Sequence, residues 1–344
     1  MDRPFPLFYA VIVYVSLLVK KKGCSSMKTI RVNFVDFWDS PHHDLSHDLC
    51  YKLLARKYHV EVTEDPDYLF CGGIGHDHYN YDCVKIVTIG ENISPDFNAF
   101  DYAIGFDKIE FGDRYLRVPL FVFYDEYEKL VKGMPSPGRE ELLNRKFCSF
   151  VVSNAGADDF RVRFFKELSK YKCVDSGGRY LNNVGGPVKD KNEFCRQYKF
   201  NIAFENCCSP GYVTEKVMQP LTVFSVPIYY GDDAVEDDFV AQRIVRVKGA
   251  SDIDRAIEEI VRLDKNDDEY VEKCMLSSLV RPATYYYEIL EKFLLNIVEQ
   301  PYEEAKRLCC RGFQPILRSR MKAMYRRDDQ IKWPFRKLRK LLCR

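Results

Sequence analysis

The stretch YKFNIAFENCCSPGYVTEKVMQPLTVFSVPIYYGDD, residues Tyr198–Asp233, decides the fold of this chain. It begins with an apolar run of strand length, Tyr198–Phe204, which a polar loop, Glu205–Tyr212, follows. Val213–Phe224 then carries apolar residues at helical spacing, and Val226–Tyr230 is a second short strand. Strand, loop, helix and strand in this order predict a βαβ unit of a parallel sheet.

Five residues of this stretch lie where a parallel sheet binds ligands, outside the carboxyl ends of its strands: Glu205, Asn206, Tyr212, Glu215 and Lys216. Lys216 falls in the first turn of the predicted helix, where a cation opposes the helix dipole. A nearby anion would remove this conflict, and a helix N-terminus with a lysine suits a phosphate or diphosphate. The alternative is a solvated lysine on an amphipathic helix.

The composition indicates a globular chain of two domains with reduced thiols. The chain has 344 residues, of which 46% are hydrophobic and 14% aromatic. Its 13 cysteines are odd in number, and the adjacent pairs Cys207-Cys208 and Cys309-Cys310 lack the spacing of a zinc site. We therefore expect free thiols in a cytosolic protein rather than a disulfide framework.

The two ends of the chain differ from its body. The apolar run Phe5–Val19 is short for a membrane span, and three lysines follow it, whereas an anchor or signal peptide places its cations first. We interpret residues 1–27 as an inert extension, or Met27 as near the true start. Residues 305–344 hold 14 Lys and Arg against 2 acidic residues, whereas the first 304 hold 38 basic and 49 acidic residues. In this basic tail, apolar residues alternate with cations, which favours an anionic membrane surface over nucleic acid.

The first half reads as alternating strands and helices. Lys28–Phe37 predicts the first strand, Asp44–Tyr58 a helix, and Lys85–Ile89 a later strand. Glu91 comes directly after that strand, where a carboxylate can act as a general base. The alternative is an ordinary loop glutamate. The cluster His76-Asp77-His78 has no spacing that makes its members converge, so we expect no metal site there.

The polar segment Lys132–Arg145 reads as a linker, and the pattern then restarts. Phe147–Val152 predicts a strand and Asp158–Tyr171 a helix. Arg161 shares the inward face of that helix, and an inward arginine in a first turn suits phosphate oxygens. Arg161 and Lys216 therefore both lie at helix starts in the second half.

Two blocks of the chain resemble the α1,3-fucosyltransferases, especially the bacterial ones. They are Gly90–Leu120, GENISPDFNAFDYAIGFDKIEFGDRYLRVPL, and Tyr198–Gly231, with its core FEN…GYVTEK and the strand ending VPIYYG. The resemblance spans roughly residues 28–300. It departs from the family at Cys207-Cys208-Ser209-Pro210, and the heptad repeats of some bacterial members are absent.

The resemblance implies an α/β fold of GT-B type, in which two Rossmann-like domains face each other across a cleft. Residues 28–145 would form the acceptor-side domain, residues 146–304 the GDP-fucose-binding domain, and residues 305–344 a basic helical tail. Carried onto matching positions, Glu91 would be the general base. Arg161 and Lys216 would hold the diphosphate, Tyr212 and Glu215 would contact the GDP moiety, and Asn206 would lie near the donor sugar.

The implied reaction is inverting transfer of L-fucose from GDP-β-L-fucose to O3 of GlcNAc in a Galβ1-4GlcNAc-type glycan, such as one of a lipopolysaccharide. No metal is required in this reading, and stimulation by Mn²⁺ stays open. The tail implies a cytoplasmic enzyme on the inner face of the cytoplasmic membrane. Three alternatives stay open: α1,4- or dual specificity, another nucleotide-sugar transferase of this fold, and an inactive glycan- or membrane-binding protein.

Overall fold

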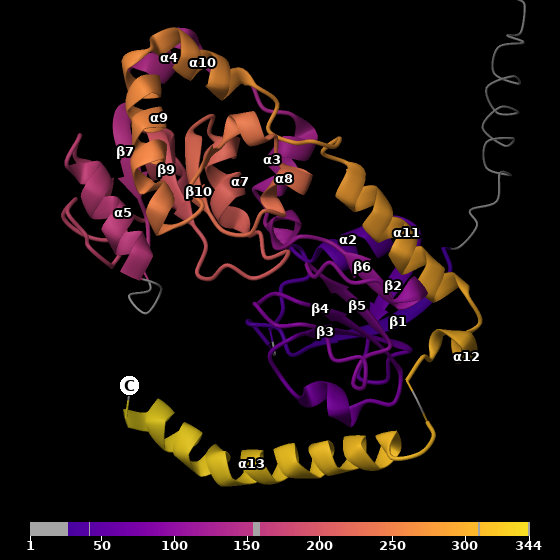
Figure 1. Ribbon diagram of the computed structural model, residues 1–344. Helices are drawn as coiled ribbons and strands as arrows, with labels where there is room; N and C mark the ends of the chain where they lie inside the picture. The colour runs from indigo at the N-terminus through magenta and orange to yellow at the C-terminus, as the bar shows by residue number, and fades with distance from the viewer. Residues whose placement is uncertain (1–26, 41, 154–158, 309, 343–344) are drawn as a thin grey trace, which may run out of the picture.

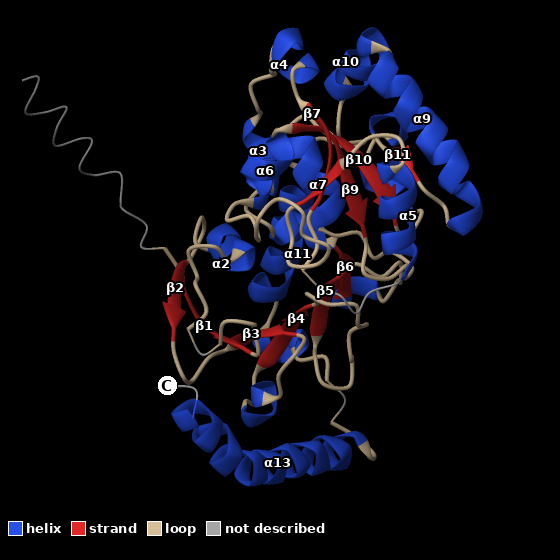
Figure 2. Ribbon diagram, turned by 90° about the vertical axis from the view of Figure 1, so that its left-hand side faces the viewer, coloured by secondary structure: helices blue, strands red, loops and turns tan. Residues whose placement is uncertain are grey.

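The computed structural model describes residues 27–342 except 41, 154–158 and 309. Two separate parallel sheets form its centre, one in each half of the chain (Figures 1 and 2). The predicted extension, residues 1–27, lies outside the described residues apart from Met27. No helix among the described residues is long and apolar enough to cross a membrane.

The first sheet has six strands in the order β2-β1-β3-β4-β5-β6, all parallel. They are β1 (Thr29–Val35), β2 (His59–Val62), β3 (Tyr68–Gly72), β4 (Val84–Thr88), β5 (Tyr102–Gly105) and β6 (Tyr115–Arg117). Val32 is the register partner of both Val62 and Tyr68. β1 therefore lies between β2 and β3, and the connection from β2 to β3 crosses over it.

The second sheet has five parallel strands in the order β11-β10-β9-β7-β8. They are β7 (Lys146–Phe150), β8 (Val174–Ser176), β9 (Tyr198–Phe204), β10 (Val226–Tyr230) and β11 (Val245–Arg246). The βαβ unit predicted for Tyr198–Asp233 is confirmed, with β9 buried along its whole length. A strand whose residues are all buried in this way is typical of a parallel sheet covered on both faces.

The helices cover these sheets and connect them. They are α2 (Leu49–Leu54), α3 (Tyr127–Lys132), α4 (Arg139–Leu143), α5 (Asp159–Ser169), α6 (Lys191–Arg196), α7 (Glu215–Thr222), α8 (Val235–Asp238), α9 (Ile253–Lys265), α10 (Asp267–Met275), α11 (Tyr285–Glu299), α12 (Tyr302–Ala305) and α13 (Gln314–Leu342). Short 3-10 turns lie at Asp77–Asn80, Gly112–Arg114, Leu120–Phe123, Ala241–Arg243 and Ala250–Asp252.

Three predicted segments differ in the structure. The helix expected at Asp44–Tyr58 begins only at Leu49, because the Asp48 side chain caps it and Asp44 closes a turn with Ser46. The helix expected at Val213–Phe224 is shorter, since Thr214 is its N-cap and Phe224 has a φ of 56°. The predicted linker Lys132–Arg145 contains helix α4.

Helix α11 falls within the range predicted for the second domain, residues 146–304, yet it packs against α2. Its buried face, which includes Leu290 and Leu294, belongs to the same apolar cluster as Ile30 and Val32 of the first domain. The hydrophobic spacing of α11 predicts a helix but does not say which sheet it covers. The chain therefore returns to the first domain before the tail begins.

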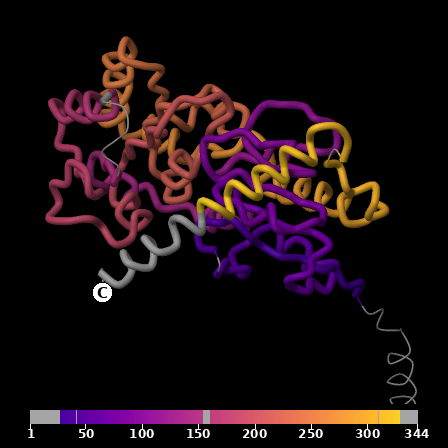
Figure 3. Tube along the Cα trace, turned by 90° about the horizontal axis from the view of Figure 1, so that it is seen from below, coloured from indigo at the N-terminus to yellow at the C-terminus, as the bar shows by residue number. Residues whose placement is uncertain are grey.

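The basic tail forms helix α13, which lies beneath the first domain (Figures 1 and 3). Its Tyr325 ring stacks on His76 at 4.6 Å and on Tyr79 at 5.7 Å between ring centroids. Gln314 donates to Asn98 at 2.9 Å near the start of the helix. These contacts give the helix a defined place on the domain.

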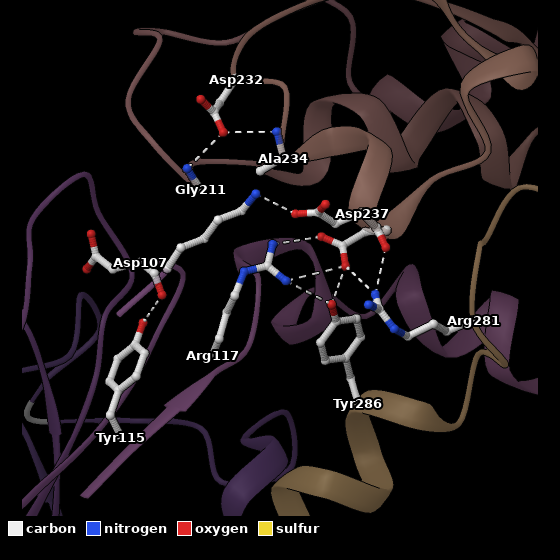
Figure 4. Close-up of polar contacts among 11 residues, drawn as sticks. Asp107, Tyr115, Arg117, Gly211, Asp232, Ala234, Asp237, Arg281 and Tyr286 are labelled. Carbon is white, nitrogen blue, oxygen red and sulfur yellow. Dashed lines mark hydrogen bonds and ion pairs between the residues drawn. The ribbon is translucent and has the colours of Figure 1, made fainter. Parts of the chain in front are cut away.

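A buried carboxylate joins the two domains, at the point where the labelled side chains Arg117, Arg281 and Tyr286 converge in Figure 4. Asp238, whose side chain has no exposed surface, binds Arg117 of β6 at 2.9 Å and Arg281 at 3.4 Å. The hydroxyl of Tyr286 donates to the same carboxylate. Around it, one apolar cluster runs from Phe121 of the first domain to Phe239 of the second.

Replacing Asp238 should destabilise the whole molecule. The change Asp238→Ala leaves two arginines near a buried site without their shared anion, which costs on the order of 3–5 kcal/mol. Urea denaturation measures this loss. The control is Asp237→Ala, which removes a partly exposed ion pair with Lys108 at 2.6 Å and should cost below about 1 kcal/mol. Equal effects of the two changes would contradict the role given to Asp238.

Candidate functional site

The second-domain part of the site lies where the strand order of the sheet reverses. Chain connections run from β7 to β8 on one side and from β9 to β10 on the other, so the crevice opens between β7 and β9. Open parallel sheets bind ligands at such a point. The segment after β9 begins with Glu205 and Asn206, and Arg161 stands in the first turn of α5, which follows β7.

Glu205 is the centre of this part of the site. Its carboxylate has no exposed surface and accepts hydrogen bonds from the backbone N–H of Thr214 at 2.8 Å and from its hydroxyl at 2.7 Å. Lys216 Nζ donates to Glu205 at 3.2 Å and to Thr214 Oγ1 at 3.0 Å. Tyr229 donates from the next strand at 3.4 Å. The carboxylate thus fixes the N-terminus of α7 and the lysine together.

The anion that the sequence predicts near Lys216 is therefore provided first by the chain itself. Burial acts to lower the pKa of Lys216, but the carboxylates of Glu205 and Glu215 raise it above its usual value. Burial raises the pKa of Glu205 even beside this ammonium group. Burial also acts to raise the pKa of Glu215, but Lys216 and Lys191 hold it below its usual range. Lys216 therefore stays protonated at neutral pH. Two of its three N–H donors form hydrogen bonds, one with Glu205 and one with Thr214.

Arg161 lies inside the crevice, as its helical face predicts. The residue is 4% exposed, and its guanidinium donates to Asn206 Oδ1 at 3.2 Å and to the Glu205 carbonyl at 3.5 Å. The structure thus brings Arg161, Asn206, Glu215 and Lys216 into one cluster around Glu205. The two cations reach it from separate helices.

Tyr212 stands apart from that cluster. Its ring is buried against Phe106 of the first domain, with centroids 5.2 Å apart and planes at 73°. It belongs to an apolar cluster with Leu69 and Val87. Burial raises the pKa of its hydroxyl, and Glu205 and Glu91 act in the same direction. Tyr212 therefore fastens the second-domain loop to the first domain.

Glu91 lies on the rim of a cavity of about 360 Å³ in the first domain. The cavity opens at the carboxyl ends of β1, β3 and β4 and is closed by the N-terminus of α2 and by Tyr124. Glu91 is exposed. Its negative charge acts to raise the pKa values of the Tyr124 and Tyr212 hydroxyls. The carboxylate is thus open to a molecule in the cavity and close to the second domain.

Two hydrogen bonds connect the loop around Glu91 with the second domain. Asn92 Nδ2 donates to Cys207 Sγ and to Ser209 Oγ, both at 2.9 Å. Burial raises the pKa of the Tyr124 hydroxyl, and the carboxylate of Glu215 acts in the same direction. At Gly211, with a φ of 80°, a Cβ would meet the Phe106 carbonyl oxygen at 2.5 Å, so only glycine fits. The segment Cys207–Tyr212 therefore bridges the carboxylate of one domain and the cations of the other.

Sequence reasoning placed Glu205 at the strand end but gave it no role, and it missed Asn92 and Tyr124. The rule that singled out Glu91, a carboxylate directly after a buried strand, also fits Glu205. The contacts of Asn92 and Tyr124 depend on how the domains meet, which no local pattern contains. His78 pairs with Asp36 at 2.7 Å, and no group of three or more His, Cys, Asp or Glu among the described residues could hold a metal.

Comparison with known proteins places both halves of the chain. Residues 32–124 match the family model of the N-terminal domain of α1,3-fucosyltransferase FucT. Residues 143–275 match that of the C-terminal part of glycosyltransferase family 10, the fucosyltransferases. The α1,3-fucosyltransferase FucT of Helicobacter pylori is 31% identical over 324 residues, covering 81% of this chain and 67% of that enzyme. This chain belongs to the α1,3-fucosyltransferase family.

Solved structures agree with this assignment. A crystal structure of an α1,3-fucosyltransferase with GDP has a TM-score of 0.68 and 29% identity, and covers 81% of this chain and 93% of that one. One with GDP-fucose has a TM-score of 0.67 and 29% identity, covering 82% and 95%. The fold of this fucosyltransferase is therefore the GT-B arrangement. One family match contains Glu91 and the first-domain cavity, and the other contains Arg161, Glu205 and Lys216.

Proposed function

We propose that this fucosyltransferase moves L-fucose from GDP-β-L-fucose to O3 of GlcNAc in a Galβ1-4GlcNAc-type acceptor, with inversion at C1. The observation that carries the proposal is the position of Glu91. This exposed carboxylate lies beside a cavity in one domain, and its neighbour Asn92 contacts the loop that follows Glu205 in the other domain. Two cations, Arg161 and Lys216, lie at helix starts of that second domain. The solved relatives with GDP and with GDP-fucose support this donor.

Glu91 acts as the general base in this mechanism. It removes the proton of the GlcNAc O3 hydroxyl as that oxygen attacks C1 of fucose from the face opposite GDP. The new C1–O3 bond forms as the bond from C1 to the diphosphate oxygen breaks, which inverts the configuration at C1. The cavity beside Glu91 receives the acceptor glycan.

The second domain stabilises the leaving GDP. Negative charge grows on the diphosphate as the bond to fucose breaks, and preorganised cations lower the energy of that state. Arg161 and Lys216 supply two positive charges, and the positive end of the α7 dipole adds to them. Glu215 contacts the GDP moiety, Asn206 lies near the fucose, and Tyr212 holds the loop between them. With these cations the reaction needs no metal, and Mn²⁺ acts at most on product release.

The tail gives the enzyme peripheral contact with a membrane. Helix α13 contains most of the basic residues of the segment 305–344 and is held on the first domain through Tyr325. Cations on such a helix are attracted to anionic lipid headgroups. We therefore place the enzyme in the cytoplasm, on the inner face of the cytoplasmic membrane.

The change Glu91→Gln should lower kcat by about 10²- to 10⁴-fold, because the amide cannot take the proton. The dissociation constant of GDP-fucose should not change. Turnover is followed with GDP-fucose and N-acetyllactosamine, and NMR of the product gives the linkage. Glu110→Gln, a change at an exposed glutamate of the same domain, is the control. Wild-type turnover in Glu91→Gln would show that Glu91 is not the general base. Transfer from UDP-sugars or GDP-mannose but not from GDP-fucose would exclude GDP-fucose as the donor.

The changes Arg161→Ala and Lys216→Ala should each weaken GDP binding by about 10- to 100-fold, because each removes a charge-assisted contact with phosphate. Isothermal titration calorimetry measures the affinity. Arg163→Ala is the matched control, since Arg163 is exposed on the same helix, two residues from Arg161. Wild-type affinity in both site variants would contradict the diphosphate assignment.

Deleting residues 317–344 should leave activity in solution intact and lower binding to vesicles rich in phosphatidylglycerol. Sedimentation with these vesicles and with neutral phosphatidylcholine vesicles measures the difference. The loss should be largest at low salt, because the attraction is electrostatic. A truncated enzyme that still sediments like the full chain would refute membrane contact through the tail.

A further inference from the structure

The side chains that line the cavity beside Glu91 carry mainly negative charge. Five of its described lining residues are acidic: Asp36, Asp39, Asp44, Asp48 and Glu91. The described lining contains two histidines, His43 and His47, and no Lys or Arg. Even with both histidines protonated, acidic side chains outnumber basic ones. A molecule that enters this cavity therefore meets a negative field.

The part of the cavity wall around His43 is held by several contacts, and two of its carboxylates stay partly exposed. His43 bridges Asp39 at 2.8 Å and Asp48 at 2.9 Å, and its ring stacks on Phe37 at 4.0 Å. These contacts hold the wall in place, but 48% of the Asp39 side chain and 62% of the Asp44 side chain remain exposed. Exposed carboxylates on a fixed wall accept hydrogen bonds from the hydroxyl groups of a ligand.

Trp38 provides the apolar surface of the same cavity. It is 75% exposed although it is the largest side chain in the lining. The turn that carries it is closed by two hydrogen bonds between Phe37 and Ser40, at 2.9 and 3.1 Å. A fixed aromatic face beside hydroxyl acceptors matches a sugar ring, which has C–H groups on one face and hydroxyl groups at its edge.

We propose that this cavity selects a neutral acceptor glycan, and that its carboxylates reject acceptors bearing a carboxylate or phosphate group close to the fucosylated sugar. Trp38 stacks on a pyranose ring of the acceptor. Asp39 and Asp44 accept its hydroxyl groups and repel anions, since a like charge in a site discriminates against the wrong ligand. The inference rests on the proposed function and specifies its acceptor class.

Steady-state kinetics with two acceptors test the proposal: N-acetyllactosamine, and the same disaccharide with sialic acid on its galactose. Wild-type enzyme should have a kcat/KM at least about tenfold higher for the neutral acceptor, a difference of the size that one or two close like charges produce. The double variant Asp39→Asn/Asp44→Asn should reduce this preference by about threefold or more. Added salt should reduce it too, because salt screens exposed charges.

Salt separates repulsion from steric exclusion, because it screens charge without changing the shape of the cavity. The asparagines remove the two charges and change the side-chain volume little. Asp268→Asn, at a carboxylate 87% exposed in the second domain, is the matched control and should leave the preference unchanged. Trp38→Ala should raise the KM of both acceptors at an unchanged KM for GDP-fucose, and Trp38→Phe should restore most of the loss. Denaturation midpoints confirm that each variant is folded.

Equal kcat/KM for the two acceptors would overturn the inference while leaving the proposed function intact. A preference that neither salt nor the asparagine variants reduce would also overturn it, because the exclusion would then be steric. If wild-type enzyme transfers fucose to neither glycan but does bind GDP-fucose, the acceptor class is wrong. If it does not bind GDP-fucose, the proposed function itself fails, and the inference fails with it.

Discussion

The buried carboxylate of Glu205 is the constraint on which the second half of the site depends. It accepts hydrogen bonds from the backbone and hydroxyl of Thr214 and from Lys216, and thereby sets where α7 begins. A buried charge of this kind is tolerated only when its partners are complete. The lysine is consequently held in one position before any ligand arrives. Even Gly231 serves this arrangement, because a Cβ there would meet the Glu205 side chain at 2.8 Å.

The segment Cys207–Tyr212, which follows Glu205, connects this buried carboxylate with the first domain. Its one end continues from Glu205 and its other end packs on Phe106, while Asn92 binds it in the middle. The loop at which this chain departs from the expected family pattern, Cys207–Pro210, thus belongs to the segment that joins the two halves of the site. Of its two cysteines, Cys207 lies within hydrogen-bond distance of Asn92. The ten cysteines that the structure describes are all free.

Much of this arrangement could be predicted from local patterns. The apolar run of β9, the spacing of α5 and α7 and the carboxylate after β4 are enough to place Glu91, Arg161, Asn206 and Lys216 at strand ends and helix starts. The pairing of Lys216 with Glu205 has no local signal, because the two residues are eleven positions apart and only the loop after β9 brings them together. The return of α11 to the first domain, and the contacts of Asn92 and Tyr124, depend on how two sheets pack. A single sequence holds no local signal for such packing.

The junction around Asp238 bears on how this enzyme reaches its reactive state. Two arginines and a tyrosine converge on this carboxylate, and the apolar cluster beside it contains side chains of both domains. Bending one sheet away from the other would expose that cluster and separate the buried charges. Rearrangement during turnover is therefore least costly in the loops at the strand ends. An active site assembled in advance in this way spends little of its substrate-binding energy on ordering the protein.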